Sequence, residues 1–129
     1  MTTYSSFYIN GQWVKPSSAD TISVYDSVTE QVMATIPAGT AADVADATRA
    51  ARAAFESWSG LPREERAKYM SRIGDALAGR MDEIATVISK ETGMTKMLSQ
   101  LVQVGLPINS FKQAAAVAES FEYSETVGT

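Results

Sequence analysis

A change of hydrophobic periodicity near residue 40 constrains this chain more than any other feature of its sequence. Before it, short runs rich in β-branched residues are separated by turn residues, a pattern typical of strands. After it, apolar residues recur every three or four positions, a pattern typical of amphipathic helices. Pro37 and Gly39 lie at the change and end the last strand-like run. The sequence therefore predicts an α+β chain with strands in residues 1–39 and helices in residues 40–122.

The β region is predicted to contain two hairpins. Asn10-Gly11 indicates the first, because both residues tolerate the positive φ angles that a two-residue type I′ turn requires. The apolar residues that flank this turn are Phe7, Ile9, Trp13 and Val14. Residues 21–25 and 31–36 are expected to pair as the second hairpin, after a loop at residues 15–20.

The second region is predicted to form about four α-helices. Thr40 and Asp43 match a capping box at the start of the first helix. Pro107 falls inside the last helix, where its missing N–H and its ring are expected to cause a kink or a break. Residues 123–129 are expected to begin a strand or to form a linker. The helices are expected at about residues 40–58, 61–79, 82–92 and 98–121.

Several groups of residues that could carry chemistry are interpreted as structural. The acidic pairs at residues 43/46, 64/65 and 82/83 lie at predicted helix starts, where carboxylates stabilise the helix dipole. Four large apolar residues recur at helical spacing and are interpreted as core rather than as the lining of a pocket: Phe55, Trp58, Met70 and Met81. The chain has no histidine and no cysteine, which excludes a cysteine nucleophile, a histidine base and the common zinc sites.

Composition limits the partners of the chain. A net charge of −4 and a pI near 4.8 predict no nucleic-acid partner. No apolar run is long enough to suggest a signal peptide or a membrane span, so no membrane association is expected. The absence of cysteine fits a reducing compartment, and a cytoplasmic location is expected.

Seven short segments follow one another over nearly the whole chain: FYINGQWV at residues 7–14, VYDSVT at 24–29, IPAGT at 36–40, DV at 43–44, AARAAFESW at 50–58, ER at 65–66 and ETG at 91–93. In this order and spacing they resemble the N-terminal pattern of the NAD(P)-dependent aldehyde dehydrogenase family. Two positions depart from the family pattern. Asp26-Ser27 stands where the family usually has Asn-Pro, and Met94 stands where it usually has lysine.

The resemblance implies that the chain is the N-terminal part of a coenzyme-binding domain with an α/β fold. The parent enzyme would oxidise an aldehyde to a carboxylic acid with NAD or NADP through a cysteine thiohemiacetal. Its catalytic cysteine, general-base glutamate and dinucleotide-binding strands would lie beyond residue 129, so no catalytic or cofactor-binding residue is assigned here and no cofactor is expected for the chain alone. The expected partners are the remainder of the parent, further copies in a homo-oligomer and a small-molecule aldehyde. The alternative is a free-standing helical interaction module without enzymatic activity.

The resemblance also implies two sites on this chain. A monovalent cation would be held by Glu91 and by the backbone carbonyls of Val24 and Tyr25; the alternative is that Glu91 is an exposed acid in a last helical turn. The mouth of an aldehyde-entry tunnel would lie on the last helix, whose residues are otherwise the ordinary core and surface of an amphipathic helix. The residues implied at the mouth are Asn109, Phe111, Lys112, Gln113 and Ala116.

Overall fold

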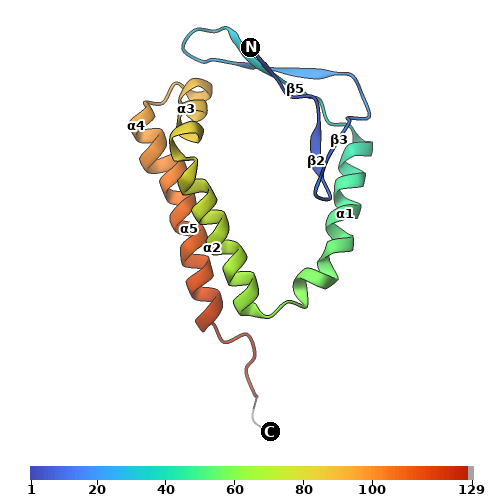
Figure 1. Cartoon of the computed structure of the whole chain (residues 1–129), viewed down its shortest axis with the longest axis vertical. Coiled ribbons are helices and arrows are strands. Elements are labelled where there is room, and N and C mark those ends of the chain that lie inside the picture. The colour runs from blue at the N-terminus through green and yellow to red at the C-terminus, as the bar shows by residue number, and fades with distance from the viewer. Residues whose placement is uncertain (128–129) are drawn as a thin grey trace. The chain divides into compact units, whose positions relative to one another are not determined.

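The computed structural model describes residues 1–127 and confirms the α+β class (Figure 1). The chain divides into two compact units. Unit 1 contains residues 1–60 and 87–94, and unit 2 contains residues 61–86 and the residues from 95 onward. Helix α3, Met81–Thr92, contributes its first residues to unit 2 and its last residues to unit 1.

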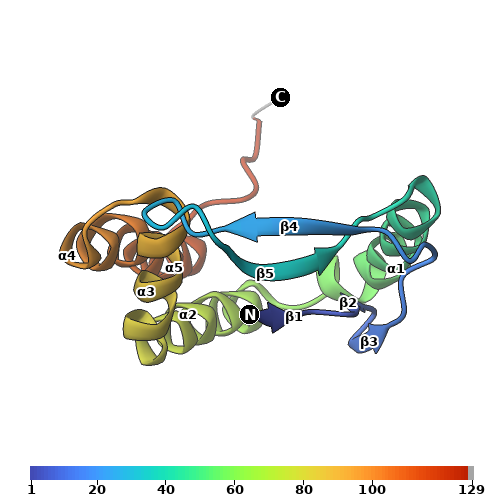
Figure 2. The same cartoon turned by 90° about the horizontal axis from the view of Figure 1, so that it is seen from above.

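The sheet of unit 1 has the order β1-β5-β4 (Figure 2). Strands β4 (Thr21–Tyr25) and β5 (Val32–Pro37) are antiparallel, which confirms the second predicted hairpin. Strand β1 (Thr2–Thr3) pairs in parallel with the other edge of β5 and was not predicted. Two threonines are too short a run to show strand periodicity, so only the pairing reveals β1. The register shifts between Val24 and Tyr25, as in a β-bulge.

The first hairpin is confirmed in detail. Strands β2 (Phe7–Ile9) and β3 (Gln12–Val14) are antiparallel and are joined by Asn10 and Gly11, with φ angles of 52° and 74°. Both angles are positive, as a type I′ turn requires. The cross-strand pair of Tyr8 and Trp13 brings the two ring centroids to 5.2 Å.

Helix α1 (Ala41–Ser59) begins at the predicted capping box, in which Thr40 accepts from the Asp43 N–H and the Asp43 side chain accepts from the Thr40 N–H. No residue of this helix is buried. The core interpretation is therefore wrong for Phe55 and Trp58, which are 54% and 42% exposed. Helical periodicity identifies an apolar face of α1 but does not show whether anything in the described chain covers it.

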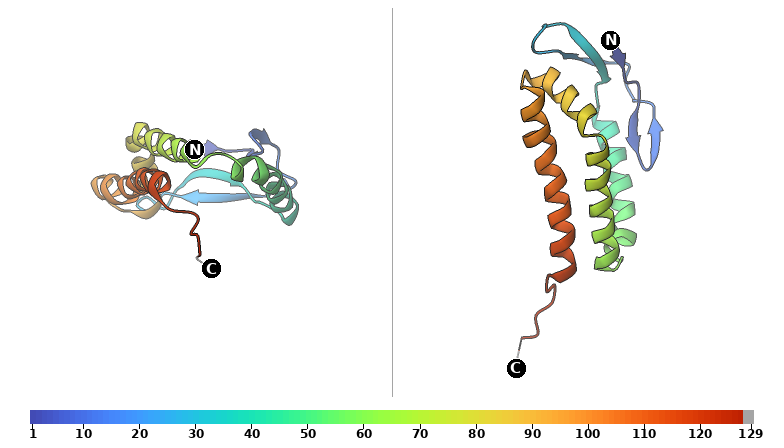
Figure 3. Two further views of the ribbon diagram at one scale, coloured as in Figure 1. Left: turned by 90° about the horizontal axis from the view of Figure 1, so that it is seen from below. Right: turned by 60° about the vertical axis from the view of Figure 1, so that its left-hand side comes forward.

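Unit 2 is built around the packing of α2 (Arg63–Gly79) on α5 (Gly105–Ser120), which Figure 3 shows side by side. The buried residues of the two helices are small or aliphatic: Ala67 and Gly74 on α2, Ile108 and Ala115 on α5. Gly74 allows close approach, because a Cβ added there would lie 3.1 Å from Cγ of Lys112. Met70 and Met81 are half-buried.

The predicted fourth helix is divided before Pro107. A short helix α4 (Lys96–Leu98) is followed by a π-helical segment, η1 (Ser99–Val104), and then by α5, which continues through Pro107. The N–H of Gly105 donates to the carbonyl of Gln100, five residues earlier. The irregularity thus lies in the turn before the proline, where the ring would crowd an α-helical backbone.

Helix α3 ends before Gly93, whose φ of 72° suits a helix-terminating glycine. Residues 121–127 form neither helix nor strand, and residues 128–129 of the predicted strand or linker lie outside the described residues. No helix within the described residues is long and apolar enough to span a bilayer.

Candidate functional site

Three of the five implied tunnel-mouth residues share one exposed face of α5. Asn109, Gln113 and Ala116 are spaced four and three residues apart, so they lie above one another on the helix. Ile108 and Ala115, which are buried, mark the side of α5 that packs on α2. The exposed face carries an amide, a second amide and a methyl group, and none of the three residues is charged.

The Lys112 side chain starts at the edge of that face and reaches toward α2. Its Nζ is 2.5 Å from Oδ1 of Asp75, and its Cγ is the atom nearest to the place that a Gly74 Cβ would take. The side chain is thereby held across the helix pair. The structure therefore separates Lys112 from Asn109, Gln113 and Ala116.

Phe111 lies on the other flank of the packed side of α5. It is half-buried and lines a shallow hollow whose other lining residues are Met70, Pro107, Ser110 and Ala114. The five residues implied at a tunnel mouth thus have three different surroundings. Sequence spacing could have separated only Phe111, because residue 111 is two positions from residue 109, whereas residue 112 is three positions from residue 109 and four from residue 116. The ion pair with Asp75 on α2 is what directs the Lys112 side chain elsewhere.

The implied cation site lies near the junction of the β4–β5 turn with the end of α3, within unit 1. Ser27 donates from its N–H and from its hydroxyl to the carbonyl of Lys90, at 2.8 and 3.0 Å. Glu91 follows Lys90 directly and has an exposed side chain, while Val24 and Tyr25 pair with Ala34 and Val32 of β5.

Asp26 organises the β4–β5 turn. Its Oδ1 accepts from the N–H groups of Val28 and Thr29, at 3.0 and 3.1 Å. These bonds, that of Thr29 first, lower the pKa of Asp26, and the charge of Lys90 adds a smaller effect in the same direction. Among the described residues there is no group of three or more histidine, cysteine, aspartate or glutamate side chains that could hold a metal ion.

The acidic residues at the helix starts have structural partners. Asp43 accepts from Thr40 and Ser17, and the N–H of Thr40 is the largest cause that lowers the pKa of Asp43 to about 2. The Arg80 guanidinium lowers the pKa of Glu83 in the same way. Acidic first-turn residues on α1, α2 and α3 agree with the interpretation as charges that stabilise the helix dipole, and on α1 Asp43 also completes the capping box. The contact with Ser17 was missed, because no sequence pattern joins a loop serine to a helix 26 residues later.

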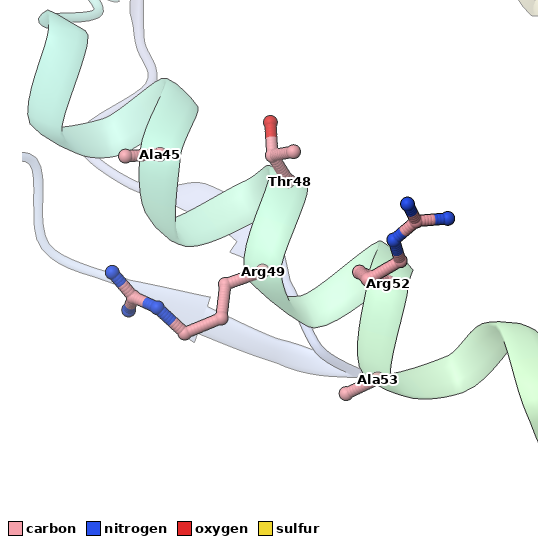
Figure 4. Close-up of a pocket in the computed structure, with 5 residues that line it drawn as sticks. All are labelled: Ala45, Thr48, Arg49, Arg52 and Ala53. Atoms are coloured by element: carbon pink, nitrogen blue, oxygen red, sulfur yellow. The ribbon is translucent and has the colours of Figure 1, made fainter.

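A second hollow lies on α1 and is lined by Ala45, Thr48, Arg49, Arg52 and Ala53 (Figure 4). All five residues come from one helix, so the hollow is an open surface. Arg49 is paired with Asp46 at 2.7 Å, and Figure 4 shows the two guanidinium groups pointing away from one another. The arrangement does not converge on a bound anion.

Comparison with known proteins gives one consistent family. The model of the "Aldehyde dehydrogenase family" matches residues 13–129. A 3-succinoylsemialdehyde-pyridine dehydrogenase from Pseudomonas sp is 35% identical over 100% of this chain and 27% of its own length. The chain thus spans about a quarter of the length of the curated relatives that it matches.

Solved structures agree with this match. A mutant of aldehyde dehydrogenase C from Pseudomonas syringae, in complex with NAD+ and octanal, superposes with a TM-score of 0.93 at 36% identity, over 96% of this chain and 26% of that one. Lactaldehyde dehydrogenase from Escherichia coli superposes with a TM-score of 0.87 at 31% identity, over 94% of this chain and 25% of that one.

Proposed function

Because this chain belongs to the aldehyde dehydrogenase family, we propose that it works as the N-terminal scaffold of an enzyme that oxidises an aldehyde to a carboxylic acid with NAD or NADP. The observation that carries the proposal is the superposition of nearly the whole chain on one quarter of a solved aldehyde dehydrogenase. The same comparison supports residues 1–129 as part of a coenzyme-binding domain.

The reaction itself needs groups that this chain does not contain. A cysteine thiolate would add to the aldehyde carbonyl, the resulting thiohemiacetal would give a hydride to NAD(P)+, and water would release the acid from the thioester. The chain has no cysteine, so it supplies neither the nucleophile nor, by itself, the activity. In this proposal the chain supports and positions the part of the parent enzyme that carries the catalytic groups.

We place the aldehyde entrance on the exposed face of α5 defined by Asn109, Gln113 and Ala116. Two amides and a methyl group offer hydrogen bonds and apolar contact without charge. The side chains of Phe111 and Lys112 are directed elsewhere, because Phe111 lines the hollow beside Met70 and Lys112 is held by Asp75. In this proposal the two residues orient α5 and do not touch the aldehyde.

One experiment tests the parent enzyme and the isolated chain together. An antibody against α1 would capture the protein from cells that express the gene, and mass spectrometry and an assay of aldehyde-dependent NAD(P)H formation would follow. We expect a polypeptide several times larger than 13.9 kDa with activity, and no activity above a heat-treated control for the pure 129-residue chain. Activity of the pure chain would show that the proposal is wrong.

The interaction module remains the competing function. Large exposed apolar side chains, such as Trp13 at 73% and Leu101 at 65%, fit either the remainder of a parent enzyme or a separate partner. A cellular product of 13.9 kDa that lacks activity would favour the module. In the enzyme proposal the parent is a cytoplasmic homo-oligomer that acts on a small-molecule aldehyde.

A further inference from the structure

We infer that Ser27 joins the β4–β5 turn directly to the end of α3, and that this junction does not depend on a bound monovalent cation. The inference concerns unit 1 alone and is independent of the proposed activity. It rests on where the oxygen atoms of the implied cation site point and on which of their neighbours already have partners.

The Val24 carbonyl is directed to β5 and not to α3. Asp20 accepts from the N–H of Ala38 at 2.8 Å, and hydrogen-bonded pairs alternate along an antiparallel ladder. The next residue pair, Thr21 with Pro37, is then not hydrogen-bonded, which agrees with the missing N–H of proline. Continued alternation makes Val24 with Ala34 a hydrogen-bonded pair. The ladder thus directs the Val24 carbonyl to β5, and it leaves the Tyr25 carbonyl and the two oxygens of the Glu91 carboxylate.

The backbone carbonyl of Lys90, next to Glu91, also has hydrogen-bond donors already. The carbonyl of Lys90 has two lone pairs and accepts two hydrogen bonds, both from Ser27. The turn oxygen next to it, Oδ1 of Asp26, accepts from Val28 and Thr29. Protein donors therefore already use the Lys90 carbonyl and Oδ1 of Asp26, two of the oxygens nearest to the implied cation site. The three oxygens that remain, one carbonyl and the two of the Glu91 carboxylate, are too few for a hard cation, which prefers a larger set of oxygen ligands.

Ser27 supplies both donors that connect the β4–β5 turn to the end of α3. The family usually has proline at this position, and proline would offer neither the N–H nor the hydroxyl that Lys90 receives. Gly93 fits the same packing, because a Cβ at this residue would lie 3.2 Å from Oγ of Ser27. The turn and the helix end are thus in direct contact through one serine.

Three variants of the full 129-residue chain test the inference. Ser27→Ala keeps the N–H, Ser27→Pro removes both donors, and Ser124→Ala is a matched control in the exposed segment after α5. Urea unfolding would be measured at one ionic strength in sodium, potassium and choline chloride. We expect the unfolding midpoint of the unchanged chain to be the same in all three salts. Each lost hydrogen bond should lower the ratio of folded to unfolded chain by about fivefold.

The same measurements can overturn the inference. A midpoint that rises saturably with sodium or potassium relative to choline would show a cation at the junction. Equal midpoints for Ser27→Ala, Ser27→Pro and Ser124→Ala would show that Ser27 does not hold it. If urea unfolding is not cooperative, hydrogen exchange at the Ser27 N–H decides: we expect slow exchange in choline chloride, and fast exchange that only potassium or sodium slows would contradict us.

Discussion

Asp43 accepts two hydrogen bonds from Ser17, one from its N–H at 3.0 Å and one from its hydroxyl at 2.9 Å. The two residues are 26 positions apart in the sequence. The same carboxylate caps α1 through Thr40, so one side chain joins the loop before β4 to the start of the first helix. Four donated bonds stabilise its ionised form.

We predict an acid-sensitive contribution from Asp43 to stability. Its pKa lies below the ordinary value of 3.8, at about 2, because the folded chain stabilises the charged form. This contribution is complete above pH 3.8 and is lost as the pH falls through about 2. Urea midpoints measured across this range should show less pH dependence for Asp43→Asn than for the unchanged chain. Asp46→Asn is the control, and an equal loss of pH dependence in both variants would contradict the prediction.

The second prediction concerns the positive φ of Gly11. Gly11→Ala should destabilise the chain by about 1–2 kcal/mol, because a Cβ disfavours the left-handed backbone of the turn. Gly79→Ala is a matched control, since a Cβ at either glycine meets no atom within 4 Å and only Gly11 has a positive φ. Chemical denaturation should find Gly79→Ala unchanged or more stable by up to about 1 kcal/mol. Equal effects at the two glycines would show that backbone strain is not the cause.

The third prediction tests the close contact between α2 and α5. In a Lys112→Ala background, Gly74→Ala should stabilise the chain by about 1 kcal/mol, because alanine favours helix and the nearest side chain is gone. In the unchanged chain the contact with Lys112 Cγ should remove that gain and cost about 1 kcal/mol more. A double-mutant cycle of unfolding free energies measures the difference. Additive effects would mean that Lys112 moves aside freely.

The fourth prediction concerns the exposed apolar residues of the isolated chain. We expect the pure chain to self-associate, because side chains such as Leu101 are exposed and unpaired apolar surface favours association. Sedimentation over a range of concentrations should show larger species at high concentration. Leu101→Ser should reduce this, while Gln103→Ser, an exposed polar residue of the same π-helical segment, should not. A sharp monomer at every concentration would refute the expectation.

Local interactions explain what could be predicted from the sequence. Asn10-Gly11 specifies its turn through its own φ angles, and Thr40 with Asp43 caps α1 within one turn of helix. Gly93 ends α3 for the same kind of reason. Each of these signals depends on residues no more than four positions apart, so the order of residues is enough to recognise it.

The tertiary structure decided what depends on distant partners. Thr2 and Thr3 become a strand only because β5 lies beside them, and no property of two threonines predicts that pairing. The hydroxyl of Ser27 reaches the carbonyl of Lys90 across 63 positions, and that contact lies next to Glu91 of the implied cation site. At the implied tunnel mouth, Lys112 is drawn to Asp75 on α2 and away from Asn109.

By itself, then, the sequence determined the turns, the helix ends and the family pattern, because these follow from short-range backbone geometry and from the order of residues. The tertiary structure decided which side chains are buried and which residues of the implied sites lie together. Phe55 lies on an apolar helix face and is still 54% exposed, since burial requires a second surface as well as an apolar side chain. Pro107 predicted an irregular helix, but only the folded backbone shows where the irregularity lies. It is the wider π-helical turn at Ser99–Val104, which precedes Pro107.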